Sequence, residues 1–369
     1  MLQNWLQEVP ASVLRLAKTQ PNCFGNQIDI YQQEIPDLKG VQVALIGLQA
    51  REANAVREHL YAMSFPFGTL KIADLGNARR SSASFMVQVL RELHESKIIP
   101  IIIAKTPDLI RLQYQALLTL RSAISMAVVD DHVPIHPEPV PGESAQYLDN
   151  LVDHEIAPPF FLQLLAGQTH FIDPERIARF SPQRFGMLRL GSLRSDLTTA
   201  EPLIRDADLV GFHLRAMKQI EAPAVEGKSP SGLFSEDAAQ LARYAGMSDK
   251  LLSFGLYGFQ ANMEGKVQTA QLISQLIWYF LDGLAHRKQD FPVSTDGLVE
   301  YIVDFKGDDQ QLVFWKSMKS GRWWIQIPAE TNDELKRHRL VPCAYQDYLQ
   351  ACEGDLPDRL FNALSRFEA

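Results

Sequence analysis

The stretch IIPIIIA, residues 98–104, is aliphatic almost throughout. A strand with one exposed face alternates apolar and polar residues, whereas a run that is apolar throughout indicates a strand covered on both faces. Strands of that kind are typical of parallel sheets with helices packed on either side. The stretch therefore predicts an α/β fold.

Further apolar runs alternate with amphipathic stretches on both sides of this one. The other predicted strands are 41–48, 70–75, 124–130, 160–165, 187–190, 209–214 and 251–256. The clearest predicted helices are 52–62, 83–96, 108–120, 235–245 and 269–283. This alternation predicts a three-layer α/β domain around a doubly wound, mainly parallel sheet.

Three segments are expected along the chain. Residues 1–40 form an N-terminal segment, 41–297 the α/β domain, and 298–369 a C-terminal appendage packed on the main domain. The appendage alternates as hairpins do, with turns predicted at 306–308 and 319–321, and continues into helices at 345–351 and from Pro357 onward. A proline-rich insertion at 132–142 excludes regular structure from that part of the domain.

Composition excludes several classes of function. The 369 residues carry a net charge of −8, which argues against a nucleic-acid partner. Cys23, Cys343 and Cys352 are too few and too scattered for a disulfide framework or a thiolate zinc site. The first 18 residues lack the apolar core of a signal peptide, and the longest apolar run, 272–285, is too short to cross a bilayer. A cytoplasmic protein without membrane partners is expected.

The strand 124–130 ends in a pair of metal-ligand residues, Asp130 and His132. Side chains two residues apart at a strand end point to the same side, and a carboxylate with an imidazole can bind a metal ion. In open α/β sheets, ligands gather at the carboxyl ends of the strands. A catalytic two-metal site would need further carboxylates and histidines from the neighbouring strand ends, 104–108, 211–215 and 256–260, which mostly carry other residues.

The order and spacing of these strand ends resemble the ureohydrolase family of arginase, agmatinase and formimidoylglutamase. They correspond to the family motifs Gly-Gly-Asp-His, Asp-Ala-His-x-Asp and Ser-x-Asp-x-Asp. Residues 221–223, and 230–233 followed by Glu236, resemble the family's active-site loop and helix start. The blocks 289–292, 322–324 and 338–343 resemble a formimidoylglutamase-like branch of Bacteroidetes type. The resemblance covers residues 24–369 and implies the arginase fold, in which six residues hold two manganese ions that ionise a water to attack a guanidinium or amidine carbon.

Residue by residue, the resemblance implies a depleted metal site. The histidine of the first motif falls on Pro107, and the last aspartate of the second motif falls on Pro134, neither of which can ligate. The two aspartates of the third motif fall on His213 and Arg215. A guanidinium among two dications would repel both. The glutamate that contacts substrate in arginase-like members falls on Gly258.

The leading expectation is a ureohydrolase-fold protein that has lost the binuclear manganese site and the hydrolysis of guanidines and amidines. It would act as a binding or regulatory homologue without a cofactor, with Asp130 and His132 in a helix cap or a hydrogen-bonded pair. Arg215 and Lys105 would either hold an anion where the metals sit in the family or only stabilise the vacated site. An internal salt bridge between Arg215 and Asp130 is predicted because it would keep that carboxylate paired.

Two alternatives remain open. One is a hydrolase of carbon–nitrogen bonds in linear amidines that uses a single zinc or manganese ion at Asp130, His132 and His213. The other is an inactive partner that completes an oligomer of an active paralogue. The small-molecule or protein partner is not identified by the sequence, and a homo-oligomer is compatible with all three hypotheses.

Overall fold

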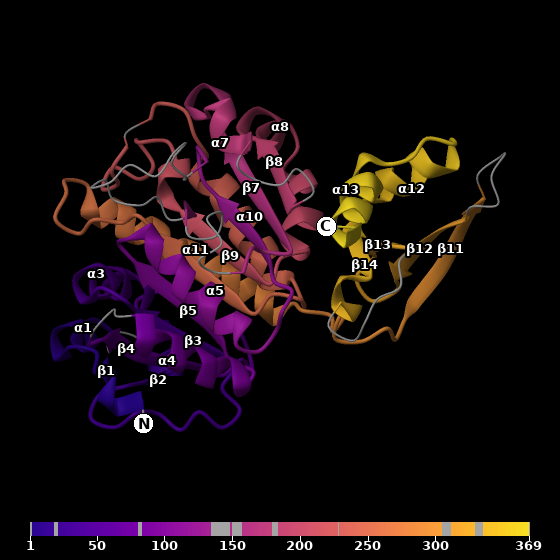
Figure 1. Ribbon diagram of the computed structural model, residues 1–369. Helices are drawn as coiled ribbons and strands as arrows, with labels where there is room; N and C mark the ends of the chain where they lie inside the picture. Colours follow the sequence, from indigo (N-terminus) through magenta and orange to yellow (C-terminus); the bar gives the residue numbers. More distant parts are fainter. Residues whose placement is uncertain are drawn as a thin grey trace.

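The computed structural model describes residues 2–17, 21–79, 83–133, 148–149, 157–178, 184–227, 229–304, 311–328 and 335–368. Figure 1 shows a larger part with helices on both faces of a long sheet, and a smaller part around a second sheet. No helix of these described residues is long and apolar enough to span a membrane.

Among the described residues, ten strands form the sheet of the larger part. They are ordered β1-β4-β3-β5-β10-β9-β6-β7-β8, with β2 also paired to β4. All pairs are parallel except β1 with β4. The strands are β1 (Leu6–Gln7), β2 (Asp29–Ile30), β3 (Val43–Gly47), β4 (Ile72–Ala78), β5 (Ile99–Ala104), β6 (Ser125–Val129), β7 (Phe161–Gly167), β8 (Phe185–Arg189), β9 (Leu209–His213) and β10 (Ser253–Tyr257). The predicted doubly wound α/β fold is confirmed.

Helices cover both faces of this sheet, as strands without a polar face require. Residues of α3, α10 and α11 pack on one face, and residues of α4 and α5 pack on the other. The helices of the larger part are α1 (Ala11–Ala17), α2 (Phe24–Gln27), α3 (Ala50–Leu60), α4 (Ala83–Glu95), α5 (Ile110–Leu118), α7 (Pro174–Ala178), α8 (Leu190–Ser195), α9 (Ala200–Arg205), α10 (Ser235–Met247) and α11 (Lys266–Ala285). Short 3-10 helices are η1 (Leu2–Asn4), η2 (Pro107–Leu109), η3 (Thr169–Phe171), η5 (Leu197–Thr199) and η6 (Leu214–Ala216).

The position of strand β5 between two helical layers explains why its sequence is apolar throughout. Ile101 and Ile103 lie in the core beneath α3, α10 and α11, whereas Ile102 and Ala104 lie in the core beneath α4 and α5. The alternation of side chains along a strand therefore sends successive residues into two different cores. Neither face of the strand is open to solvent, so a polar side chain at any of these positions would be buried.

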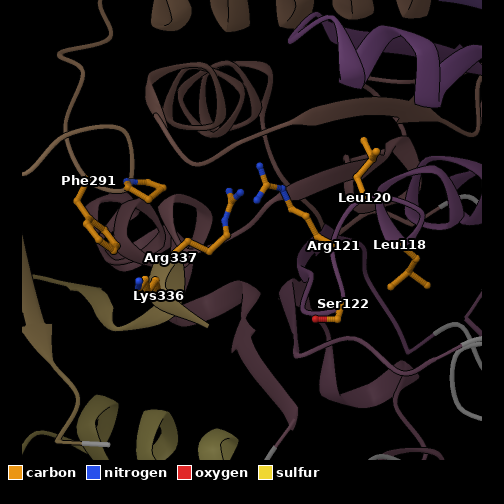
Figure 2. Close-up of a pocket in the computed structure, with 8 residues that line it drawn as sticks. Leu118, Leu120, Arg121, Ser122, Phe291, Lys336 and Arg337 are labelled. Atoms are coloured by element: carbon orange, nitrogen blue, oxygen red, sulfur yellow. The ribbon is translucent and has the colours of Figure 1, made fainter. Parts of the chain in front are cut away.

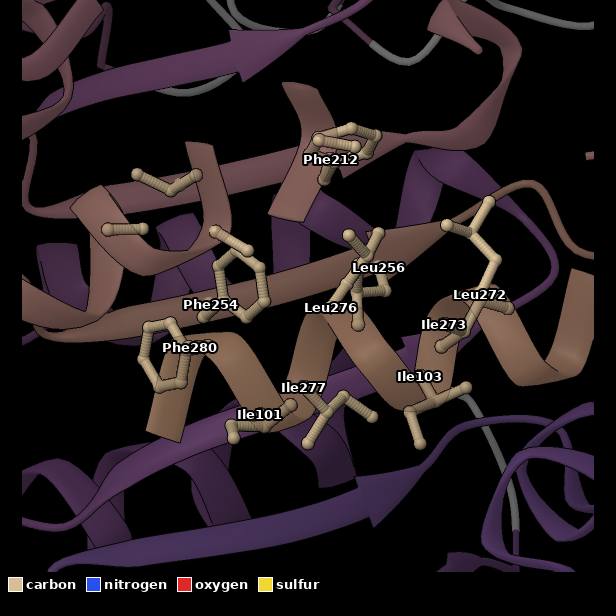
Figure 3. Close-up of a cluster of buried hydrophobic side chains, with 14 of the residues drawn as sticks. Ile101, Ile103, Phe212, Phe254, Leu256, Leu272, Ile273, Leu276, Ile277 and Phe280 are labelled. Atoms are coloured by element: carbon tan, nitrogen blue, oxygen red, sulfur yellow. The ribbon is translucent and has the colours of Figure 1, made fainter. Parts of the chain in front are cut away.

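Helix α11 lies along β5 and β10 and fills the first of these cores (Figure 3). Its buried residues Ile273, Leu276, Ile277 and Phe280 recur at helical spacing. The Phe280 ring stacks on Phe254 of β10, with ring centroids 4.5 Å apart and an interplanar angle of 7°. The apolar run 272–285 is thus a core helix.

Segment 1–40 contributes to the edge of the same sheet. Leu6 and Gln7 of β1 pair with Ala78 and Asn77 of β4, and β2 pairs with the other part of β4. The two short strands lie beside β4, which already has β3 as its other neighbour. The described part of this segment therefore packs as an extension of the large sheet.

The smaller part starts at β11 and consists of one antiparallel sheet with two helices on it (Figure 1). Its turn at 319–321 joins β12 to β13 as predicted, and the turn predicted at 306–308 lies outside the described residues. Helices were expected at 345–351 and from Pro357, and both are present. The elements are β11 (Leu298–Asp304), β12 (Gln311–Ser317), β13 (Trp323–Gln326), η7 (Lys336–His338), β14 (Leu340–Cys343), α12 (Tyr345–Cys352) and α13 (Asp358–Glu368).

Buried charges connect the two parts. Arg205 of α9 donates to backbone carbonyls of β13 and β14, and its guanidinium carbon lies 4.5 Å from the ring centroid of Trp324. Asp206 accepts from Lys250 at 2.8 Å and from Arg366 of α13 at 2.6 Å. Burial raises the pKa of the Asp206 carboxyl, but Lys250 and Arg366 outweigh it and hold that pKa well below its usual value. Paired, ionised groups therefore fix the smaller part against the larger one.

Candidate functional site

Four neighbouring strands bring the sequence-predicted site residues to one edge of the sheet. The order β5-β10-β9-β6 is parallel throughout, so the carboxyl ends of these strands lie side by side. Lys105 follows β5, Gly258 follows β10, His213 ends β9 and Asp130 follows β6. This is the edge at which α/β folds bind their ligands.

Asp130 is fully buried and is paired with Arg215. The Arg215 Nη2 donates to Oδ1 at 3.1 Å and to Oδ2 at 3.0 Å, and Nε donates to Oδ1 at 3.2 Å. The predicted salt bridge is therefore confirmed. Arg215 lies in η6, just after β9, and Gly227 packs beside its side chain: a Cβ on Gly227 would lie 3.0 Å from the Arg215 Cδ.

Asp131 also belongs to the cluster, although it was not predicted as a site residue. Its Oδ1 accepts from the Arg215 Nε at 2.9 Å and lies 2.6 Å from the His132 Nδ1. Asp130 and His132 lie close together as predicted, and Asp131 joins them because β6 ends at Val129, so residues 130–132 no longer alternate as in a strand. The available signal was a second carboxylate directly after Asp130, at the sheet edge that also carries Arg215.

His213 faces Asp130 from the next strand. Val129 pairs with Phe212, so Asp130 comes opposite His213, and the His213 Nδ1 lies 3.4 Å from the Asp130 Oδ1. Gly258 has φ +96°, and a Cβ there would lie 2.8 Å from the His213 Nε2. The glycine therefore makes room for the imidazole, at the position where the family resemblance expects a glutamate.

The charge state of Asp130 follows from these contacts. Burial on its own raises the pKa of the Asp130 carboxyl. His213 and Arg215 outweigh the burial and hold that pKa well below its usual value, with a smaller contribution from His132. Asp130 is thus an ionised carboxylate whose charge is balanced from within the protein.

The remaining candidates have different surroundings. The carbonyl oxygen of Lys105 accepts from the Gly258 N–H at 3.1 Å, and the Lys105 N–H donates to Gln49 at 2.8 Å. Pro107 opens η2 and offers no side-chain ligand. Pro134 lies outside the described residues. Lys105 is therefore joined to this edge of the sheet through its backbone.

Arg215 contacts the same donor atoms that a metal ion at this edge would use. Asp130, Asp131 and His132 each offer an atom within 4.8 Å of the others. The predicted ligand His213 is not part of this group, and its Nδ1 lies 3.4 Å from the Asp130 Oδ1. Both carboxylates, however, are already hydrogen-bonded to the Arg215 guanidinium. A positive charge at that position repels cations, and its N–H groups compete with a metal ion for these carboxylate oxygens.

Comparison with known proteins gives a fold. No family model and no curated protein sequence matches the chain. A Trypanosoma cruzi formiminoglutamase solved with Mn²⁺ is 15% identical, with TM-score 0.60 over 69% of this chain and 100% of that one. Bacillus subtilis formimidoylglutamase is 14% identical, with TM-score 0.62 over 71% and 91%. Bacillus subtilis arginase is 13% identical, with TM-score 0.54 over 65% and 98%. The chain therefore has the arginase/ureohydrolase fold that the order of its strand ends predicted.

Proposed function

We propose that this protein is a non-hydrolytic member of its fold, which has replaced the two-metal centre by an internal arginine and acts in binding or regulation. The observation that carries the proposal is the single guanidinium of Arg215 hydrogen-bonded to both Asp130 and Asp131. In this fold the same edge of the sheet would otherwise hold the reaction centre.

An arginine can take over the structural task of a metal ion but not its chemical task. Its planar guanidinium neutralises a buried carboxylate and supplies several N–H donors in a fixed arrangement. It cannot act as a Lewis acid, and its own pKa is too high for it to act as a base at neutral pH. Arg215 therefore supports the packing of Asp130 without supporting activation of a water.

The charge of the cluster bears on the ligand. Asp130 and Asp131 both face the guanidinium of Arg215, and the imidazoles of His213 and His132 lie beside them. An anion at Arg215 would compete with both carboxylates for the same N–H groups. This competition disfavours the anion considered from the sequence alone.

The test is an assay for hydrolysis of arginine, agmatine and formimidoylglutamate by tag-free protein in the presence of manganese. We expect no product above that of a matched Asp130→Asn variant. Turnover that is lost in Asp130→Asn would overturn the proposal. Circular dichroism of both proteins shows whether the variant is folded.

A hydrolase with one metal ion is the second candidate, because Asp130, Asp131 and His132 offer three donor atoms within 4.8 Å of one another. A single ion there requires Arg215 to release at least one carboxylate. Zinc would suit three protein ligands with an open fourth position. In this alternative, His132→Ala abolishes metal content and activity together, whereas the leading proposal expects neither to be present.

A further inference from the structure

An open pocket of about 510 Å³ lies at the opposite edge of the large sheet, where the two parts of the protein meet. Three separate segments line it: the chain after α5 that leads into β6, the connection from α11 to β11, and η7 of the smaller part. Its lining residues are Leu118, Leu120, Arg121, Ser122, Phe291, Pro292, Lys336 and Arg337. Asp130 and Arg215 lie at the carboxyl ends of the strands, whereas this pocket lies at their amino ends. The pocket is therefore separate from the site described above.

Positive charge converges on the pocket in a protein whose net charge is −8. Arg121, Lys336 and Arg337 line it, and none of the described lining residues is acidic. Figure 2 shows the guanidinium groups of Arg121 and Arg337 pointing toward one another. Burial and the neighbouring Arg337 lower the pKa of Arg121. Two facing guanidinium groups repel each other, and an anion between them would relieve that repulsion.

The protein compensates this charge only in part. The Arg337 Nη2 lies 2.6 Å from Oδ1 of Asp208, a fully buried carboxylate that also attracts Arg121. The Arg337 Nε is buried and has no hydrogen-bond acceptor among the described residues. The Arg337 Nη2 also donates to the Lys250 carbonyl oxygen at 2.9 Å. One carboxylate thus faces two guanidinium groups, which leaves an excess of positive charge at the pocket.

The other lining residues, apart from Ser122, are apolar. Phe291 lies at one side, and Leu118 and Leu120 lie at the opposite side (Figure 2). Pro292, next to Phe291 in the chain, also lines the pocket. Rings and aliphatic side chains at the rim of a charged site favour a ligand with an apolar or aromatic group beside its charge. An inorganic anion would contact the cationic side chains but leave the apolar ones without a ligand contact.

From this arrangement we propose that the pocket binds a small organic dianion, in which a phosphate or a pair of carboxylates lies between Arg121 and Arg337 and an aromatic or other apolar group contacts Phe291 and Pro292. Guanidinium groups recognise both kinds of oxyanion through paired N–H donors. Because Arg121 belongs to the larger part and Arg337 to the smaller, the bound ligand holds the two parts together. Binding therefore stabilises the folded protein.

The test uses isothermal titration calorimetry on the full chain with phenyl phosphate and phenylmalonate, alongside inorganic phosphate and phenol. We expect one aromatic dianion or the other to bind with 1:1 stoichiometry and to weaken as salt increases. Inorganic phosphate and phenol should bind at least about tenfold more weakly, since each offers half of the contacts. Binding by phenyl phosphate alone, or by phenylmalonate alone, identifies the oxyanion.

Variants locate the site. Arg121→Gln removes a cation without touching the Arg337–Asp208 pair, and should weaken binding by about tenfold or more. Arg91→Gln, which removes an exposed arginine of α4, is the matched control and should bind as the native protein does. Neither variant touches Arg215 or Asp130, which lie at the other ends of the strands, so failure here and failure of the proposed function are separable. Absence of binding by both aromatic dianions, or an unchanged affinity in folded Arg121→Gln, would overturn the proposal.

Discussion

Arg215 donates from one nitrogen, Nη2, to both carboxylate oxygens of Asp130, at 3.1 and 3.0 Å, and Asp130 is fully buried. The pair lies at the carboxyl edge of the sheet, where this fold would carry its reaction centre. With the Nε also donating to Oδ1 at 3.2 Å, the guanidinium keeps this buried carboxylate ionised without a metal ion. The stability of the protein should therefore depend on Arg215.

Replacing Arg215 by methionine should destabilise the protein by about 3–5 kcal/mol, because the buried Asp130 loses its charge partner. Urea denaturation followed by fluorescence measures the change. Arg91→Met removes an arginine of an exposed ion pair and should cost no more than about 1 kcal/mol. A double variant with Asp130→Asn should recover part of the loss, and equal stability of Arg215→Met and native protein would contradict this account of the pair.

Gly258→Ala should destabilise the protein by about 1–3 kcal/mol. The φ of +96° disfavours any side chain, and the new Cβ would lie 2.8 Å from the His213 Nε2. Thermal or urea unfolding measures the effect. In the background of His213→Ala the same substitution should cost less, since the clash is then absent and only backbone strain remains. The same cost in both backgrounds would show that His213 does not require the glycine.

Phe280 should be among the most costly residues to truncate in the larger part. Phe280→Ala removes a fully buried ring stacked on Phe254 and should cost about 3–5 kcal/mol in the free energy of unfolding. The adjacent Tyr279, 40% exposed, is the matched control. Tyr279→Ala should be several-fold milder in the same urea titration; similar losses for both would mean that α11 does not bury the face described here.

Stability should fall on mild acidification because of His338, at the junction of the two parts. Burial and the neighbouring Lys250 lower the pKa of His338 to about 3. Its Nε2 lies 3.2 Å from the Ala123 carbonyl oxygen, and its Nδ1 lies 3.1 Å from the Lys250 Nζ, which suits a neutral ring. The unfolded chain takes up a proton near pH 6.5 whereas the folded one does not, so this contribution to stability is complete above pH 6.5 and declines as the pH falls toward 3.

The measurement is urea denaturation of native protein and of His338→Gln between pH 7.5 and pH 5, a window above the ordinary titration range of carboxylates. The glutamine offers a donor and an acceptor but does not titrate. The native protein should lose more stability than the variant over this window. Parallel pH profiles would contradict a neutral, buried His338 as the cause.

The fold was predictable because its strands lie between two helical layers and so need apolar residues on both faces. Residues 98–104 show this directly: Ile101 and Ile102 are neighbours in sequence and lie in different cores. Helices α8 and α9 were not predicted, because each has only six residues and too short an amphipathic pattern. The charged junction around Asp206 was equally hidden, since its partners Lys250 and Arg366 are distant in sequence.

At the candidate site, the sequence predicted the pairing of Arg215 with Asp130 but not the part played by Asp131. The pairing followed from charge: a buried carboxylate needs a partner, and the strand order supplied Arg215. The position of Asp131 depended on where β6 stops, and strand boundaries are set by local hydrogen bonding that a residue pattern does not specify.

The central claim is that Arg215 replaces the metal centre, and its most direct test is elemental analysis of tag-free protein supplied with manganese and, separately, with zinc. We predict no stoichiometric metal under either condition in the native protein. The Arg91→Gln variant, dialysed in the same way, shows how much metal binds non-specifically at the protein surface. About one or two metal ions per chain, lost on replacement of Asp130 by asparagine, would contradict the claim and would favour a metal-dependent hydrolase instead.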